Sequence, residues 1–153
     1  MTGWAITALL SVVLLLIAMI DFRQYRIPDL LSLPLLLAGL ALAWTDGPDA
    51  LIDRLIGAII GFSVLAAFGE AYFRLRGVDG LGLGDAKLFA AAGAWLGWQA
   101  LPLVLLIAAG SGLMVAMLSG VRGRGGKIAF GPWISLGFLI VWLVESDRTM
   151  NFF

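Results

Sequence analysis

Long apolar runs separated by short polar stretches dominate this chain of 153 residues. The first run extends from Trp4 to Ile20, and over the whole sequence 61% of residues are hydrophobic while only 13% are charged. A soluble domain carries about 45–50% apolar and about 25% charged residues. The composition therefore excludes an ordinary soluble enzyme. It also excludes a disordered chain or a nucleic-acid-binding chain, so no nucleic-acid partner is expected.

The apolar runs predict transmembrane helices. A membrane helix needs about 20 mostly apolar residues, so this chain has room for about six short helices with tight loops and for no separate soluble domain. We predict an all-α fold, a polytopic membrane helix bundle that forms one integral-membrane domain over residues 1–153. The expected helices cover residues 4–20, 30–44, 50–73, two segments between 86 and 118, and 133–144.

The apolar run over residues 86–118 is compatible with one very long helix or with a hairpin of two. In a hairpin the chain turns near Gly97, and Pro102 falls in the first turn of the second helix, where its missing N–H costs nothing. Lys and Arg accumulate in cytoplasmic loops, and only a six-helix arrangement collects most basic residues on one face. We therefore predict a hairpin and both termini on the non-cytoplasmic side. The eight basic residues on the cytoplasmic face are Arg23, Arg26, Arg74, Arg76, Lys87, Arg122, Arg124 and Lys127.

Two further sequence features concern packing and chemistry. The spacing of Gly57 and Gly61, and the Ala/Gly-rich segment after Asp85, predict close helix packing. The sequence contains no Cys and no His, which excludes thiolate nucleophiles, zinc-thiolate sites, Ser-His triads and His-ligated metals. No metal and no cofactor are expected, and acidic residues become the leading candidates for catalysis.

Most acidic residues have ordinary structural explanations. Asp46, Asp49 and Asp53 lie in or beside a predicted turn. Asp29 precedes the second predicted helix and is a natural N-cap. Glu70 lies four residues before Arg74, a spacing that favours an ion pair on one helix.

Asp21 and Asp85 differ from the other acids. Asp21 ends an uninterrupted apolar run, and Asp85 follows the Gly-rich residues 80–84 and begins an Ala-rich helix. A carboxylate at membrane depth costs about 2.5–3.5 kcal/mol and is a functional candidate by default. The ordinary alternatives are an interfacial charge near Arg23 for Asp21 and a helix N-cap for Asp85. Both acids fall on the predicted cytoplasmic face, at ends of helices that can pack together, which favours a functional pair.

A pair of carboxylates can perform acid–base catalysis as in aspartic proteases. Two like charges a few Å apart cannot both ionise, so such a pair shares one proton. The ionised partner then accepts a proton from water, and the protonated partner donates to the scissile carbonyl or the leaving amine. Gly82 and Gly84 lack a Cβ, so their backbone can approach an extended peptide closely and can adopt φ > 0.

Three sequence elements, in this order, resemble those of the type IV prepilin peptidases, which are GxGD-type aspartic membrane proteases. Residues 76–88, Arg-Gly-Val-Asp-Gly-Leu-Gly-Leu-Gly-Asp-Ala-Lys-Leu, resemble the signature loop of that family, and residues 91–98 resemble its continuation. Ile20-Asp21 with Ile27-Pro28-Asp29 resembles the first aspartate and the Ile/Leu-Pro-Asp/Asn element, and Phe130-Gly131-Pro132 resembles the Phe-Gly-Pro element. The resemblance covers roughly residues 15–140.

The resemblance implies a function and a set of site residues. It implies a membrane-embedded aspartic endopeptidase of the bacterial inner (cytoplasmic) membrane. Such an enzyme cleaves the leader of type IV prepilins or pseudopilins at the cytoplasmic face, for pilus or type II secretion assembly. The family's substrates carry a short basic leader that ends in Gly and precedes an apolar helix. Asp21 and Asp85 match the catalytic aspartates, and the supporting motif residues are Gly82, Gly84, Lys87, Pro28, Asp29, Gly131 and Pro132. For Lys87, a snorkelling anchor at the inner face is the ordinary alternative.

One departure from the family pattern bears on the activity. Many bacterial members carry an N-terminal zinc-binding domain with paired cysteines and also N-methylate the cleaved pilin. Because this chain has no Cys and begins one helix before Asp21, we expect the short form, which cleaves without N-methylation.

Other functions remain open at this point. One is a small proton- or cation-coupled transporter with Asp21 and Asp85 as its ion sites, although the uniformly apolar outer half argues against it. A second is a non-catalytic membrane scaffold, and a third is a protease for other membrane segments. The oligomeric state is not indicated.

Overall fold

The computed structural model describes residues 3–77, 81–119 and 129–150, and all regular structure within these ranges is helical. This confirms the predicted all-α class for the described residues. The helices extend beyond most of the apolar runs that predicted them. In chain order the elements are α1 (Gly3–Gln24), α2 (Asp29–Asp46), α3 (Pro48–Arg76), α4 (Leu83–Leu96), the short 3-10 turn η1 (Trp98–Ala100), α5 (Leu101–Ser119) and α6 (Gly131–Met150).

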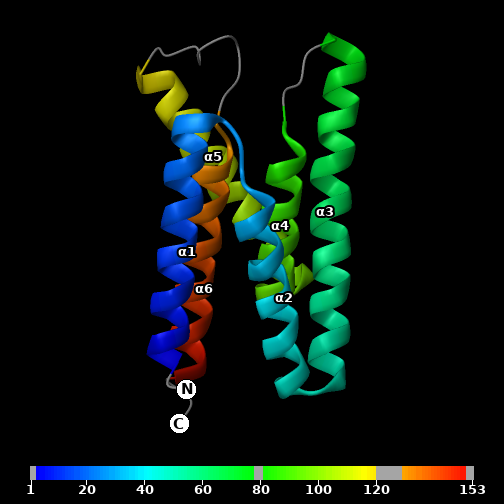
Figure 1. Cartoon of the computed structure of the whole chain (residues 1–153), viewed down its shortest axis with the longest axis vertical. Helices are drawn as coiled ribbons and strands as arrows, with labels where there is room; N and C mark the ends of the chain where they lie inside the picture. The colour runs from blue at the N-terminus through cyan, green and yellow to red at the C-terminus, as the bar shows by residue number, and fades with distance from the viewer. Residues whose placement is uncertain (1–2, 78–80, 120–128, 151–153) are drawn as a thin grey trace.

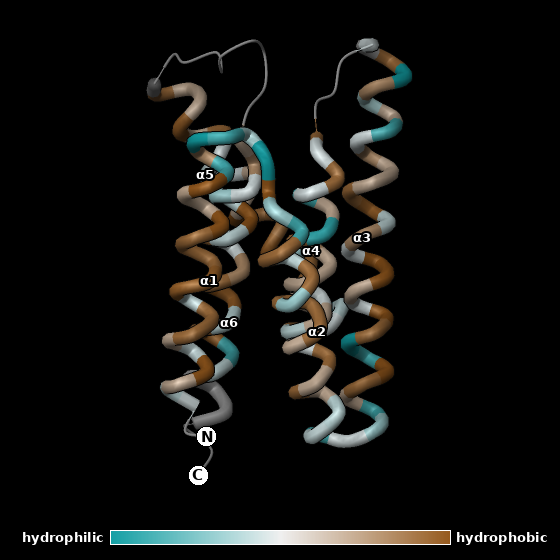
Figure 2. The backbone as a smooth tube through the Cα atoms, viewed as in Figure 1, coloured by the Kyte–Doolittle hydropathy of each residue, from teal (hydrophilic) through white to brown (hydrophobic). Residues whose placement is uncertain are grey.

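The outer surface of the bundle is suited to lipid. Among the described residues, α1, α2, α3 and α5 are long and apolar enough to cross a membrane, and α6 contains a shorter apolar stretch. Figure 2 shows hydrophobic residues along most of the length of these helices. Leu9, Leu106 and Met117 are 62%, 69% and 76% exposed, which is unfavourable in water and costs nothing against lipid tails. The predicted polytopic membrane bundle is therefore confirmed.

The short helix α4 forms the centre of the molecule. It packs against α2, α3 and α6, while α6 in turn packs against α1 and α5 (Figure 1). Almost every residue of α4 from Asp85 to Trp95 is buried, and most of them are Ala or Gly, so neighbouring backbones come close. The Trp95 Nε1–H donates to the Leu35 carbonyl oxygen of α2 at 2.7 Å. The indole ring of Trp95 meets the Trp142 ring of α6 edge-on, with centroids 5.2 Å apart.

The predicted close packing of small residues is confirmed between α3 and α4. A Cβ added at Gly61 would lie 2.8 Å from the Phe89 carbonyl oxygen, and one added at Gly93 would collide with the Gly57 carbonyl group. These distances leave no room for any side chain at the contact. The glycines therefore set the distance at which α3 supports the central helix.

The predicted hairpin between α4 and α5 is also confirmed. The chain leaves α4 at Gly97, which has φ 81°, and the Gly97 N–H caps the Gly93 carbonyl oxygen at 2.9 Å. Pro102 is the second residue of α5, where a helix does not need its N–H. With this hairpin, the ends of α1, α3 and α5 lie at the same end of the bundle (Figure 1), which is the arrangement that the charge distribution predicts.

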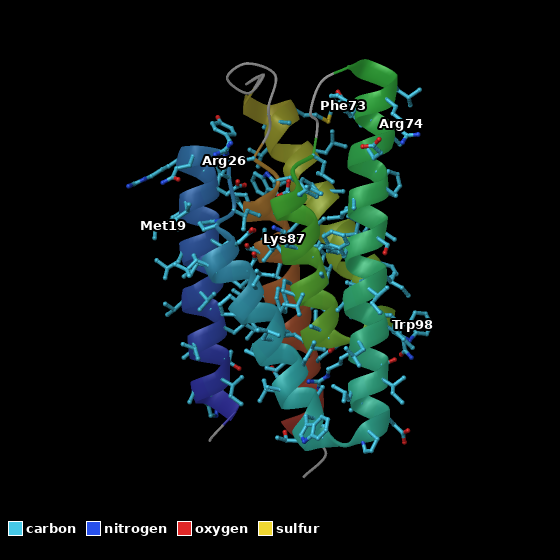
Figure 3. The ribbon with its side chains drawn as sticks, turned by 45° about the vertical axis from the view of Figure 1, so that its right-hand side comes forward. Met19, Arg26, Phe73, Arg74, Lys87 and Trp98 are labelled. Carbon is cyan, nitrogen blue, oxygen red and sulfur yellow. The ribbon has the colours of Figure 1, made fainter. Side chains whose placement is uncertain are left out.

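The two ends of the bundle carry different residues. The start of α1 and the end of α6 lie at one end (Figure 1), and Arg26 and Arg74 lie at the other (Figure 3). The side chain of Arg76, and all of Asp79, Arg122, Arg124 and Lys127, lie outside the described residues. An even number of passes agrees with this arrangement, and the assignment of the Arg26 end to the cytoplasm stays a prediction.

Candidate active site

Asp21 is a buried carboxylate near the end of α1. It is 4% exposed, whereas its neighbours Phe22 and Arg23 are exposed. The Gly131 N–H, the first of α6, donates to Asp21 Oδ2 at 3.1 Å. The first N–H groups of a helix have no partner within the helix and attract negative charge, so α6 provides a binding site for this carboxylate. Asp21 thus has a hydrogen-bond partner within the bundle, which favours the functional alternative over an interfacial charge near Arg23.

Asp85 is the third residue of α4 and is 8% exposed. Its Oδ2 accepts the Gly82 N–H at 3.2 Å, and the Asp85 N–H donates to the Gly82 carbonyl oxygen at 3.0 Å. The expected capping role is thus present, but Asp85 caps from the third position of the helix and Gly82 is the N-cap. A carboxylate that accepts one N–H retains other lone pairs for a reactant.

The structure brings Asp21 and Asp85 into one site. They come from α1 and α4, which are not consecutive helices, and Ile27 connects them: it lies against Gly84, next to Asp85, and against Gly131, the hydrogen-bond partner of Asp21. No third acidic residue joins them, since the described residues contain no group of three or more Asp and Glu side chains that could hold a metal. The arrangement is therefore that of a carboxylate pair.

The glycines beside the pair act differently from the sequence prediction. Neither Gly82, with φ −80°, nor Gly84 adopts the positive φ that their sequence suggested. Gly84 is needed for a close contact within the chain, since an added Cβ would lie 3.0 Å from Ile27 Cβ. At Gly82 an added Cβ would make only ordinary contacts, 3.6 Å from Asp85 Oδ2 and 3.8 Å from the Gly84 backbone nitrogen. Gly82 contributes its backbone N–H, which donates to Asp85 Oδ2.

Asp29 and Lys87 form an ion pair beside the site. The Lys87 Nζ donates to both carboxylate oxygens of Asp29, each at 2.7 Å. The predicted N-cap role of Asp29 is wrong, because Pro28 occupies the N-cap position of α2 and no side chain caps the helix. Lys87 lies well inside the length of the bundle (Figure 3). It pairs with Asp29 there, so it does not extend to the membrane surface as a free anchor.

The start of α6 contributes two of the predicted supporting residues. An added Cβ at Gly131 would lie 2.7 Å from Asp21 Oδ2 and 2.8 Å from Ile27 Cδ1, so any larger residue would displace the ends of these two side chains. Pro132 follows as the second residue of the helix, a position that requires no N–H donor.

Ile27 is the residue to which sequence reasoning assigned no role of its own. It is 9% exposed and contacts the glycines that adjoin both aspartates. The available signal was a branched aliphatic residue between Arg26 and Pro28, in the polar stretch that follows Asp21.

The ordinary explanations hold for other acids. The Arg54 Nη2 lies 3.0 Å from Asp46 Oδ2, and the Arg74 Nε lies 2.7 Å from Glu70 Oε1. Glu70 therefore forms the expected pair within α3 and does not join the carboxylate site. The described part of the chain thus offers Asp21 and Asp85 as its buried acids.

These features define a class of protein: a multi-pass helical membrane protein with two buried carboxylates that interact where separate helices meet. Comparison with known proteins agrees. The Type IV leader peptidase family matches residues 8–117. The chain belongs to this family, and the family match does not favour the transporter or scaffold alternatives.

Curated relatives extend the comparison. A protein of Escherichia coli (strain K12) named "Prepilin leader peptidase/N-methyltransferase" is 44% identical over 82% of this chain and 57% of its own length. Proteins with the same name from Burkholderia pseudomallei (strain 1026b) and Aeromonas hydrophila are 42% and 40% identical, over 89% and 96% of this chain and 45% and 52% of their own lengths. This chain thus spans about half the length of the curated relatives it matches. The relatives are bacterial, and together with the apolar helices they support a multi-pass bacterial membrane protein. No solved structure is significantly similar to it.

Proposed function

We propose that this chain is a membrane-embedded aspartic endopeptidase that cleaves the leader peptide of type IV prepilins or pseudopilins, with Asp21 and Asp85 as its catalytic residues. Family membership and the names of the relatives support the reaction. The observation that carries the assignment is that Asp21 and Asp85 are both buried, and that Ile27 lies against both Gly84, next to Asp85, and Gly131, whose N–H holds Asp21. The proposal covers cleavage only, not the methylation that the relatives' names also state.

The chemistry follows from a shared proton. Two neighbouring carboxylates hold one proton between them, because both cannot ionise at short range. The ionised carboxylate takes a proton from a water molecule, whose oxygen bonds to the scissile carbonyl carbon. The protonated carboxylate donates to the departing amine as the carbon–nitrogen bond breaks. The N–H groups of Gly131 and Gly82 hold each aspartate in place during both proton transfers.

The location of the pair suggests how a substrate binds. Asp21 and Asp85 belong to the half of the bundle that carries Arg26 and Arg74 (Figure 3), and basic residues favour the cytoplasmic side. In this proposal the site faces the cytoplasm across the bacterial inner membrane, and both termini lie on the other side. The apolar helix of the substrate lies in the lipid beside the bundle. Its basic leader remains in the cytoplasm, and the extended junction between them reaches the aspartates.

A cleavage assay tests the proposal. A prepilin that the Escherichia coli relative processes is expressed with this chain in cells that lack their own prepilin peptidase, and leader loss is followed as a mobility shift. Asp21→Asn and Asp85→Asn should each lower the cleavage rate by about 10²–10⁴-fold, the size of a lost general acid or base. The control is Asp46→Asn, which changes an acid at the opposite end of α2. If both site variants insert normally and still cleave at the wild-type rate, the catalytic assignment is wrong.

A further inference from the structure

The connection between α1 and α2 passes directly beside both aspartates. Helix α1 ends when Tyr25 adopts φ 52°, and the Tyr25 N–H donates to the Asp21 carbonyl oxygen at 2.8 Å. Residues 26–28 have no regular secondary structure, and Pro28 is extended, with φ −67° and ψ 130°, before α2 begins at Asp29. A non-glycine residue with positive φ is uncommon. At Tyr25 this conformation reverses the direction of the chain after α1, so the connection runs back past Asp21.

Ile27 lies between the two halves of the site. On one side its Cβ faces Gly84, which precedes Asp85, so closely that an added Cβ there would be 3.0 Å away. On the other side its Cδ1 faces Gly131, whose N–H holds Asp21. One buried side chain therefore lies between the segment that carries Asp85 and the start of α6, which hydrogen-bonds Asp21. The spacing of the pair depends on where Ile27 sits.

The Asp29–Lys87 ion pair fixes this connection to α4. Asp29 is two residues from Ile27, and Lys87 is two residues from Asp85, so the pair fastens the inserted segment to the helix that carries the second aspartate. The residues are 58 positions apart in the sequence, and both Asp29 carboxylate oxygens accept hydrogen bonds from the Lys87 ammonium group. Exposed ion pairs contribute little to stability, and the Asp29 side chain is 57% exposed. A stabilising role alone therefore explains the pair poorly.

We propose that Asp29 and Lys87 are positioning residues of this site: by anchoring the segment that contains Ile27, they set the separation of the Asp21 and Asp85 carboxylates. The inference rests on the proposed function, because it takes these two aspartates as the catalytic pair. Lys87 and Asp29 bind each other and take no part in proton transfer. Loss of either one releases the connection and misplaces the pair, and displacements near 1 Å cost about 10²-fold in rate.

The test uses the full-length chain purified in detergent, with a prepilin as substrate. Lys87→Met and Asp29→Asn should each lower kcat about 10- to 100-fold while KM changes little. Lys87→Arg keeps the charge and should retain most of the activity. The exchanged double variant Asp29→Lys/Lys87→Asp should recover part of what either single change loses. Glu70→Gln is the matched control, since Glu70 and Arg74 form an equally short pair within one helix, and it should leave kcat unchanged.

The outcomes separate this inference from the proposed function. Wild-type kcat in both Lys87→Met and Asp29→Asn, with Asp21→Asn inactive, overturns the positioning role alone. A raised KM at unchanged kcat also overturns it, because the pair would then bind substrate. If Asp21→Asn and Asp85→Asn themselves retain full cleavage, the proposed function fails. Should Lys87→Met fail to insert, Lys87→Arg and Asp29→Asn still decide the question.

Discussion

The charged contacts at the two ends of the bundle differ in the sequence distance that they span. At the end that contains the aspartates, two carboxylates are held by residues from distant segments: Gly131 and Asp21 are 110 positions apart, and Lys87 and Asp29 are 58 apart. At the opposite end the Arg54–Asp46 pair joins residues only eight positions apart across the turn between α2 and α3. A contact between distant segments also exists there, but it is uncharged: the Trp142 Nε1–H donates to Thr7 Oγ1.

The two kinds of contact should therefore affect different properties: local pairs affect folding, and pairs between distant segments affect catalysis. A local pair closes a turn that the adjacent helices would form in any case. A contact between distant segments fixes the relative position of two helices: Gly131–Asp21 joins α6 to α1, and Lys87–Asp29 joins α4 to α2. A reaction that needs two carboxylates at a set distance requires such contacts. We therefore expect substitutions in the contacts that join distant segments around the aspartates to change the cleavage rate, and those in local contacts to change stability or nothing.

The sharpest test of this comparison is Gly131→Ala. The new Cβ would lie 2.7 Å from Asp21 Oδ2 and 2.8 Å from Ile27 Cδ1, so the carboxylate must move. We expect cleavage to fall about 10²-fold, as for a misplacement near 1 Å. Gly110→Ala in α5 is the matched control, since an added Cβ there meets nothing within 4 Å. If both variants cleave equally well, the start of α6 does not position Asp21.

A smaller effect, of another kind, is expected from Gly93→Ala. This residue contacts the α3 backbone at Gly57, where an added Cβ collides with the Gly57 carbonyl group. Overpacking of this kind costs about 1–3 kcal/mol, which should appear as a lower thermal unfolding midpoint in detergent. Gly93 lies eight residues beyond Asp85, so the folded fraction should still cleave. A rate loss without any loss of stability would show that α3 packing positions the site.

The smallest effect is expected at the opposite end. Arg54→Met removes the ion pair with Asp46, and pairs of this exposure contribute about 0–1 kcal/mol. We expect an unfolding midpoint close to that of the unaltered chain and an unchanged cleavage rate. A clear loss of cleavage at normal expression would contradict the separation of the two ends.

Much of the fold can be predicted from sequence, because it depends on local properties. Apolar runs locate the helices, and Gly97 with Pro102 locates the hairpin between α4 and α5. The same holds for Gly57 and Gly61, whose spacing predicts the close contact with α4. Helix ends are less well predicted, since the helices extend into polar residues whose hydropathy carries no signal.

Some features of the candidate site can likewise be predicted from the sequence, and others cannot. Asp21 and Asp85 stand out because each carboxylate interrupts or ends an apolar segment, and the motif order identifies them as a pair. The N-cap role predicted for Asp29 was wrong. A capping preference is a local property, and here it yields to a charged partner from α4.

The sequence alone determined a membrane bundle of helices and the hairpin at its centre, and it singled out two aspartates as candidates because a carboxylate at membrane depth is costly. Only the tertiary structure decided how those aspartates are held. It placed Ile27 between Gly84 and Gly131, gave Asp21 the first N–H of α6, and paired Asp29 with Lys87. The physical reason is that periodicity and hydropathy act over a few residues. Contacts between distant segments form only when α1, α4 and α6 pack together.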